Sequence, residues 1–164
     1  MLHIHHVNLQ PIGGGGEIYT RSLTRAFVEA GAQVTLYVNP AVRLWDAVSG
    51  GRVALIQIQN EEQLLERLPR ERAIVLTQSP ITPQAVERMA ASHLVAGFAH
   101  MPMFQRGAEG FRAYHLVITV SRYCIELLRR AGCERGYPEP MYGTADLERG
   151  SGAIFRRPPY LVDP

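Results

Sequence analysis

The chain has 164 residues, a formal net charge of +2, 46% hydrophobic residues and 20% charged residues. These values are typical of a globular domain with a full core, and no apolar run reaches the roughly 20 residues that a membrane span needs. All 17 basic residues are arginine and they form no basic block. Charge therefore gives no indication of nucleic-acid binding, and chemistry that needs a lysine from this chain is excluded.

Short apolar runs alternate with helix-like segments along the chain. The runs are predicted as strands at His3–Leu9, Gln33–Val38, Val53–Ile58, Ala73–Thr77, Leu94–Ala99 and Leu116–Val120. Several of them are continuous instead of alternating, which suits strands that are buried on both faces of a parallel sheet. A strand followed by a helix, repeated about five times, predicts an α/β fold with a Rossmann-like, doubly wound, mostly parallel sheet.

The helices between these strands are predicted from apolar spacing and from their end signals, at Ile18–Ala30, Glu61–Leu68, Pro83–Ala91 and Ser121–Ala131. Thr82 and Ser121 are the expected N-caps of the last two helices. Gly31 and Gly132 are expected to stop the helices that precede them.

The composition changes towards the end of the chain. Residues 1–140 are predicted to form one Rossmann-like domain, whereas 141–164 are rich in proline and glycine and predict an irregular tail that leads into an interdomain linker. The two cysteines, Cys124 and Cys133, match no metal or redox spacing. Because the first residues also lack the pattern of a secretory signal, we expect reduced thiols in a cytoplasmic protein.

A glycine run stands between the first strand and the first helix, in Pro11-Ile12-Gly13-Gly14-Gly15-Gly16-Glu17. Ordering glycines costs entropy, so such a run is expected to serve a close backbone approach or positive φ values. At a strand-to-helix turn, free N–H groups and the positive end of the helix favour an anion such as phosphate. A flexible surface loop is the alternative.

Two nucleotide-binding fingerprints are absent. The dinucleotide pattern G-x-G-x-x-G fails because its third glycine falls on Ile18 or Tyr19, and the second strand ends in Val38-Asn39 without an acid for a ribose. The P-loop needs a lysine, which this chain lacks.

Three histidines in the first strand suggest a metal. Strand alternation places His3 and His5 on one side and His6 on the other, and the remaining histidines stand in no metal spacing. Since zinc takes three or four ligands, we expect hydrogen-bonded strand histidines and no metal.

His100 follows Leu94–Ala99, at the carboxyl end of a predicted central strand, where open α/β sheets bind ligands. Histidine there can act as acid, base or hydrogen-bond partner of a sugar hydroxyl or phosphate, or be a plain loop residue. The apolar segment Met101–Phe104 that follows could face the apolar part of a lipid-like molecule or of a sugar ring, or consist of ordinary core methionines beside a loop. Ser121 and Arg122 stand at the next strand-to-helix turn, Ser121 as an N-cap and Arg122 within reach of a phosphate or of solvent.

Together these segments resemble the N-terminal half of a GT-B glycosyltransferase of the retaining group-1 type (family 4). Gly14-Gly15-Gly16-Glu17 is similar to the Gly-Gly-x-Glu turn of that family, and His100 is placed like its histidine after the fourth or fifth strand. Val117–Ser121 is similar to the strand and serine before the last helix of that half. The resemblance covers residues 1 to about 135.

This resemblance implies a two-domain enzyme that moves a sugar from a nucleotide-sugar donor to a saccharide or lipid-linked acceptor with retention of configuration, without a further cofactor. It implies that Gly14–Glu17 approach the donor diphosphate, that His100 lies near the transferred sugar, and that Ser121 and Arg122 are accessory. The family's donor-binding half, with its paired glutamates, is not in this sequence, so the fragment is expected to be inactive. Met101 stands where the family has an aspartate.

Two other classes of function stay open at this point. A non-catalytic α/β module that binds a phosphorylated ligand or a partner protein explains the glycines equally well. A metal-dependent hydrolase would use the N-terminal histidines. The arginines and Met101–Phe104 are compatible with peripheral contact at the inner membrane face, and equally with ordinary solvated and packed residues.

Overall fold

A computed structural model describes residues 1–42, 45, 51–78, 81–100 and 108–141. In this part of the chain, six parallel strands form one sheet in the order β3-β2-β1-β4-β5-β6. The strands are β1 (His3–Asn8), β2 (Gln33–Val38), β3 (Val53–Gln57), β4 (Ile74–Thr77), β5 (Leu94–Ala99) and β6 (Leu116–Thr119). The helices are α1 (Gly15–Glu29), α2 (Glu61–Arg67), α3 (Pro83–Ala90) and α4 (Arg122–Arg130), with one 3₁₀ turn, η2 (Ala108–Phe111).

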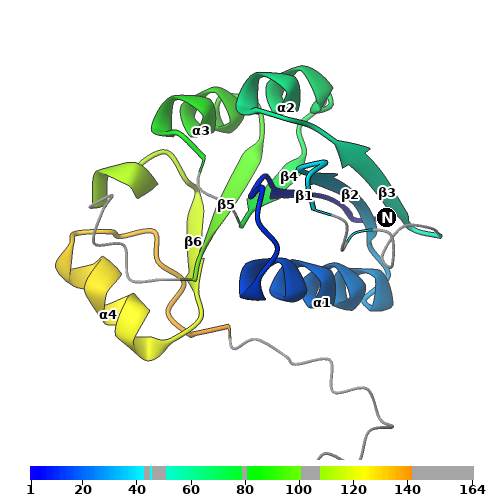
Figure 1. Cartoon of the computed structure of the whole chain (residues 1–164). Coiled ribbons are helices and arrows are strands. Elements are labelled where there is room, and N and C mark those ends of the chain that lie inside the picture. The colour runs from blue at the N-terminus through cyan, green and yellow to red at the C-terminus, as the bar shows by residue number, and fades with distance from the viewer. Residues whose placement is uncertain (43–44, 46–50, 79–80, 101–107, 142–164) are drawn as a thin grey trace, which may run out of the picture.

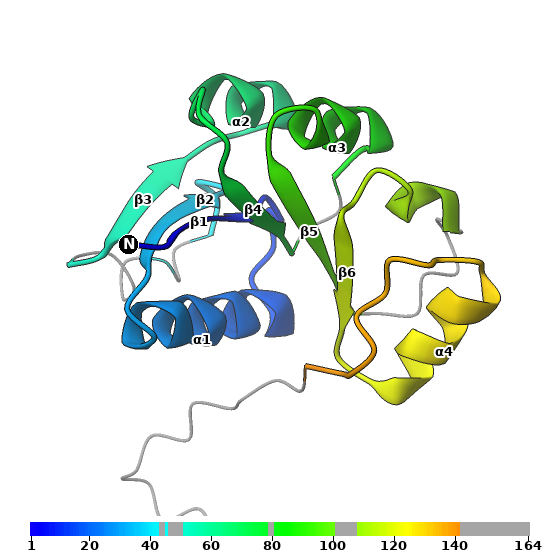
Figure 2. The ribbon, with the colours of Figure 1, turned by 180° about the vertical axis from the view of Figure 1, so that it is seen from behind.

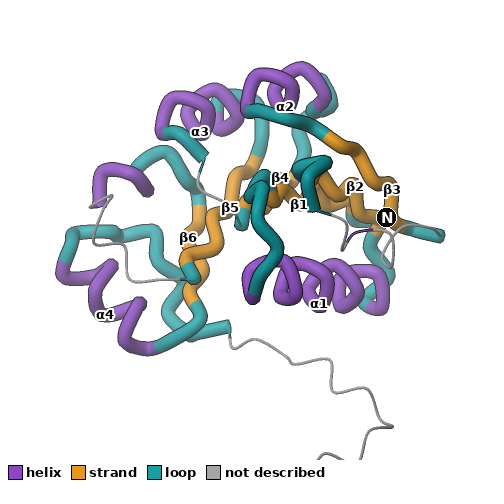
Figure 3. Tube along the Cα trace, in the orientation of Figure 1, coloured by secondary structure: helices purple, strands orange, loops and turns teal. Residues whose placement is uncertain are grey.

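The sheet is wound in two directions from its centre. The chain passes outward from β1 to β3, returns to pair β4 with β1, and then passes outward again to β6. Helix α1 covers one face, whereas α2 and α3 cover the other (Figures 1, 2 and 3). The prediction of a Rossmann-like, doubly wound α/β sheet is therefore confirmed, and the order reverses between β1 and β4.

The predicted strands agree with the observed ones to within one residue at each end, and β2 and β5 have the predicted bounds. The helices also lie close to their predicted ranges, except that α1 begins at Gly15 and not at the predicted Ile18. Gly15 and Gly16 thus lie inside its first turn. A negatively charged side chain in the first turn stabilises a helix because the N-terminal end carries partial positive charge, and here Glu17 is that side chain.

The expected helix ends are confirmed. The side chain of Ser121 accepts a hydrogen bond from the Cys124 N–H at 3.2 Å, and that of Thr82 accepts one from the Ala85 N–H at 3.4 Å. Gly31 and Gly132, which follow α1 and α4, have φ values of 90° and 76°. In this left-handed region a side chain would be strained, so glycine is required.

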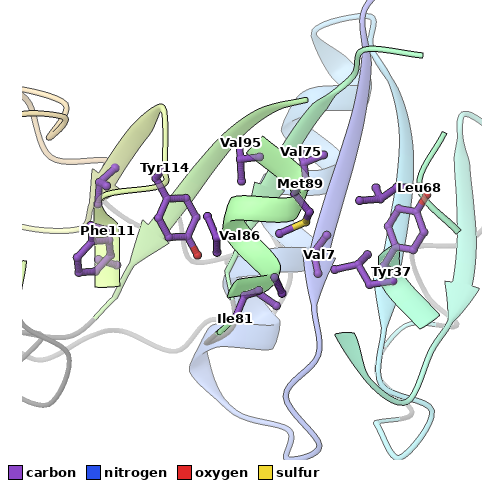
Figure 4. Packing of buried hydrophobic residues seen from close by; sticks show 14 of the residues in the cluster. Val7, Tyr37, Leu68, Val75, Ile81, Val86, Met89, Val95, Phe111 and Tyr114 are labelled. Carbon is purple, nitrogen blue, oxygen red and sulfur yellow. The ribbon is translucent and has the colours of Figure 1, made fainter. Parts of the chain in front are cut away.

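Both faces of the sheet carry apolar cores. The larger core joins strand residues such as Val7, Val75 and Val95 to Val86 and Met89 of α3 (Figure 4). The smaller core lies under α1 and contains Ile4, Leu23, Leu76 and Phe98. Because the central strands are covered on both faces, their sequences read as continuous apolar runs.

The segment after α4 returns along the edge strand β6. The Val117 N–H donates to the Arg135 carbonyl at 2.8 Å, and the Met141 N–H donates to the Thr119 carbonyl at 2.7 Å. Tyr19 of α1 donates its hydroxyl to the Met141 carbonyl at 3.4 Å. The described chain therefore reaches the carboxyl end of β6, and residues 142–164 of the expected tail lie outside the described residues.

None of the helices in the described ranges is both long and apolar enough to cross a membrane.

Gly97 lies in β5 directly beneath the ring of Tyr114. A Cβ at this position would stand 2.8 Å from Tyr114 Cε1, and the ring is buried with its hydroxyl 3.2 Å from Thr77 Oγ1. We expect Gly97→Ala to lower the free energy of unfolding by about 1–3 kcal/mol, as overpacking of a core does. Gly16→Ala, where a Cβ meets nothing within 4 Å, should raise it by about 0.5–1 kcal/mol. Urea unfolding measures both, and equal stability of Gly97→Ala and wild type would contradict the packing described.

Candidate functional site

The carboxyl ends of three neighbouring strands meet where the strand order reverses. Asn8 is the last residue of β1, Gln78 follows β4, and His100 follows β5. In open α/β sheets the crevice outside these strand ends is the usual ligand site. The N-terminal part of α1 lies over the same place, because Thr20 contacts Asn8 and Gln78, and Tyr19 contacts His100, as described below.

The glycine turn leaves the start of α1 open. Gly14 is the N-cap residue, has no side chain to cap the helix, and is extended with φ of −169°. Of the two uses predicted for the run, positive φ values are not the one observed, since Gly31, Gly51 and Gly132 are the glycines with positive φ among the described residues. Among the described residues, a Cβ at Gly15 or Gly16 would meet nothing within 4 Å. The first N–H groups of a helix have no partner within the helix, and at this turn no side chain at Gly15 or Gly16 covers them.

Glu17 is buried below this turn. Its side chain is 1% exposed, and its Oε1 accepts a long hydrogen bond of 3.4 Å from Asn8 Nδ2. The other carboxylate oxygen, Oε2, lies 3.5 Å from the position that a Cβ of Gly14 would take. The carboxylate is therefore buried beneath the turn and close to the helix start.

Thr20 connects the first turn of α1 to the sheet. Its Oγ1 accepts a hydrogen bond from Asn8 Nδ2 at 2.8 Å and donates to the Gly16 carbonyl, also at 2.8 Å. The side-chain amide of Gln78 contacts the same hydroxyl. All three side chains are at most 6% exposed. Buried polar groups of this kind hold their partners in one arrangement, because an unpaired group is costly.

His100 packs against two aromatic rings of the same region. Its ring centroid lies 5.0 Å from that of Tyr19 on α1 and 4.8 Å from that of Phe98 on β5. Burial lowers the pKa of His100 below its usual value of 6.5, and the Glu17 carboxylate opposes this by favouring the charged form. The net shift is downward, so the imidazole is neutral at neutral pH.

The N-terminal histidines make hydrogen bonds on opposite faces, as predicted. His6 Nδ1 lies 2.9 Å from Thr24 Oγ1 of α1, and burial lowers its pKa to about 3. His5 Nδ1 lies 3.0 Å from the Tyr37 hydroxyl on the other face, and burial lowers its pKa to about 4. Within the described ranges, no group of three or more His, Cys, Asp or Glu residues is placed to hold a metal ion.

The remaining predicted residues are less closely tied to this place. Ser121 uses its hydroxyl as the N-cap of α4, and Arg122 is exposed at the first position of that helix. No hydrogen bond or ring contact recorded among the described residues joins either of them to Gly14–Glu17 or to His100. The apolar Met101–Phe104 lies outside the described residues.

Sequence reasoning missed Asn8, Thr20 and Gln78, although they hold the site together. The available signal was their position. Asn8 and Gln78 are polar residues at the carboxyl ends of apolar strands, where a buried side chain needs a partner. Thr20 stands one helical turn after Gly16, on the buried side of α1.

The electrostatic link between Glu17 and His100 is directly testable. Because the carboxylate favours protonated His100, Glu17→Gln should lower the pKa of His100 further. Histidine Cε1–H shifts, followed by NMR as the pH is varied, report this pKa. Glu126→Gln on the outer side of α4 is the matched control and should leave it unchanged. An unaltered His100 pKa in Glu17→Gln would contradict the proximity of the two groups.

Comparison of the chain with known protein families, with curated proteins and with solved structures finds no significant match.

Proposed function

We propose that the chain is the N-terminal, acceptor-side domain of a retaining GT-B glycosyltransferase that uses a nucleotide-sugar donor. The observation that carries the proposal is the meeting of the glycine turn with His100. These segments lie far apart in sequence, yet Tyr19 of α1 contacts the His100 ring, and the Glu17 carboxylate favours the charged form of the His100 imidazole. These are two of the three features on which the resemblance to group-1 glycosyltransferases rests; the third is Val117–Ser121.

The start of α1 suits the leaving group of such a reaction. Glycosyl transfer places negative charge on the departing diphosphate, and N–H groups at a helix start stabilise negative charge. Gly15 and Gly16 suit a close approach because they carry no side chain, and a Cβ at either would meet none of the described residues within 4 Å. The Glu17 carboxylate is buried beneath the turn, next to Asn8.

His100 suits the sugar side of the same reaction. Positive charge develops on the transferred sugar in the transition state, and an imidazolium beside it would repel that charge. Burial keeps His100 neutral at neutral pH, so its ring can exchange hydrogen bonds with a sugar hydroxyl without this repulsion.

Two exposed apolar side chains flank the glycine turn. Ile12 is 74% exposed and Ile18 is 51% exposed. In a two-domain transferase these residues would face the cleft, where a donor-binding domain or a sugar ring would cover them. The nucleotide itself would be held mainly by that second domain, and the acceptor would be a saccharide or a lipid-linked sugar. A membrane-surface acceptor would place the enzyme peripherally at the inner membrane face.

A charge placed at the glycine turn tests the phosphate contact. Gly15→Asp adds a carboxylate that favours the helix end, so stability should be unchanged or higher, yet it should weaken pyrophosphate binding at least about 10-fold by repulsion. Gly15→Ala adds bulk without charge and should weaken binding less. Backbone amide shifts during titration with inorganic pyrophosphate measure both. Equal binding by wild type and Gly15→Asp would contradict an anion site at this turn.

Loss of the imidazole tests the catalytic side. In the gene product that contains a donor-binding domain, His100→Gln should lower turnover by about 10²-fold or more, with little change in stability. His115→Gln changes an exposed histidine just before the amino end of β6, whose Nδ1 accepts from the Val95 N–H at 3.1 Å, a bond that a glutamine oxygen can also accept; this control should retain activity. Transfer is assayed with UDP-, GDP- and ADP-sugars, and unchanged turnover of His100→Gln would remove its role. Tight nucleotide-sugar binding by residues 1–164 alone, without transfer by the longer protein, would favour the non-catalytic phosphate-binding module.

A further inference from the structure

Residues 131–141, here called the exit segment, follow α4 and return along β6. The last of them, Met141, donates its N–H to the Thr119 carbonyl at 2.7 Å, at the end of that strand. Thr119 pairs with Ala99, which directly precedes His100. The described chain therefore ends beside the candidate site, near the start of α1 (Figures 1 and 2).

Tyr19 of α1 contacts both the site and the exit segment. Its ring centroid lies 4.9 Å from that of Phe98 and 5.0 Å from that of His100, and the last two centroids are 4.8 Å apart. The Tyr19 hydroxyl donates a long hydrogen bond of 3.4 Å to the Met141 carbonyl. The Met141 side chain also packs against the smaller apolar core under α1, as Tyr19 does. One side chain thus joins the His100 ring to the exit segment.

The two ring contacts hold the His100 imidazole in one plane. Tyr19 meets it edge to face, with 82° between the planes, whereas Phe98 is tilted by 33°. Aromatic rings favour such arrangements because the edge of one ring is attracted to the face of another. Rotation of the imidazole about its Cβ–Cγ bond would break the edge-to-face contact. The direction in which His100 presents its nitrogens therefore depends on the position of Tyr19.

The link between Tyr19 and the exit segment does not depend on charge. Burial raises the pKa of Tyr19 above its usual value of 10, so the hydroxyl stays protonated and can donate at any physiological pH. The ionisable groups that interact electrostatically with His100 are Glu17 of α1 and His6 of β1. Because Met141 is uncharged, any effect of the exit segment on His100 is carried by packing and hydrogen bonds.

We propose that Tyr19 is a positioning residue that couples the orientation of the His100 ring to the exit segment. A displacement of Met141 moves the Tyr19 hydroxyl, and the His100 ring follows through its contact with the Tyr19 ring. In taking His100 as the functional group, the inference rests on the proposed function, in which the chain beyond Met141 leads to a donor-binding domain. The position of that domain would then act on the orientation of His100.

Tyr19→Phe tests the link, because it keeps the ring and removes the hydroxyl. In the 164-residue chain, hydrogen exchange of the Met141 N–H should become at least about 3-fold faster, since the exit segment loses one of its hydrogen bonds. The pKa of His100, followed through its Cε1–H shift by NMR, should rise towards 6.5, because burial is the larger effect on it and a released ring is less buried. Tyr123→Phe, at an exposed position of α4, is the matched control and should change neither quantity. If either the exchange rate or the His100 pKa is unchanged in Tyr19→Phe, the proposal is overturned.

A double-mutant cycle shows whether the effect passes through Tyr19. Met141→Pro removes the N–H that bonds Thr119 and so disturbs the exit segment without a change of charge. It should shift the His100 pKa in the wild-type background and shift it clearly less in Tyr19→Phe. An equal shift in both backgrounds, or none in the wild type, would contradict the coupling, and Tyr19→Phe alone decides if Met141→Pro does not fold.

These measurements separate the inference from the proposed function. They report on the 164-residue chain and need no sugar transfer, whereas the turnover of His100→Gln tests the transferase. Coupling without any role of His100 in turnover would leave the inference intact and remove the proposed function. Loss of turnover in His100→Gln, with an unchanged His100 pKa in Tyr19→Phe, would do the opposite.

Discussion

The hydrogen bonds of Thr20 are the constraint on which the site depends. A buried hydroxyl with one proton and two lone pairs can satisfy only certain neighbours, and here it joins α1 to the ends of β1 and β4. Apolar contacts would allow the helix to slide over the sheet, because they are not directional. Hydrogen bonds from Asn8 and towards Gly16 set the height of the first turn above the strand ends.

The N-terminal end of α1 combines two glycines without side chains and a buried carboxylate, Glu17, and the position of the first turn over the strand ends explains both. Glu17 lies inside, where Asn8 supplies a donor, whereas Gly15 and Gly16 leave the outer side bare. The negative charge at this helix start is therefore buried beneath the turn, next to Asn8. The same carboxylate reaches His100 electrostatically, so the glycine turn and the histidine form one electrostatic unit.

Where sequence reasoning failed, the reason lies in contacts between distant segments. The sequence predicts that α1 begins at Ile18, whereas the helix begins at Gly15, and the Thr20 hydroxyl holds the Gly16 carbonyl within this geometry. Of the two uses predicted for the glycine run, positive φ values are not present. Asn8, Thr20 and Gln78 were missed because each is an ordinary residue until its neighbours are known.

The sequence alone determined the strands to within one residue, the N-caps Thr82 and Ser121, and the glycine stops at Gly31 and Gly132, because these features depend on residues a few positions apart. It also determined that His3 and His5 share one face while His6 takes the other, since alternation is a local property of a strand. Only the tertiary structure decided that β4 lies between β1 and β5. That order makes the carboxyl ends of β1, β4 and β5, which carry Asn8, Gln78 and His100, neighbours in the sheet. It depends on long-range strand pairing, which no local pattern encodes.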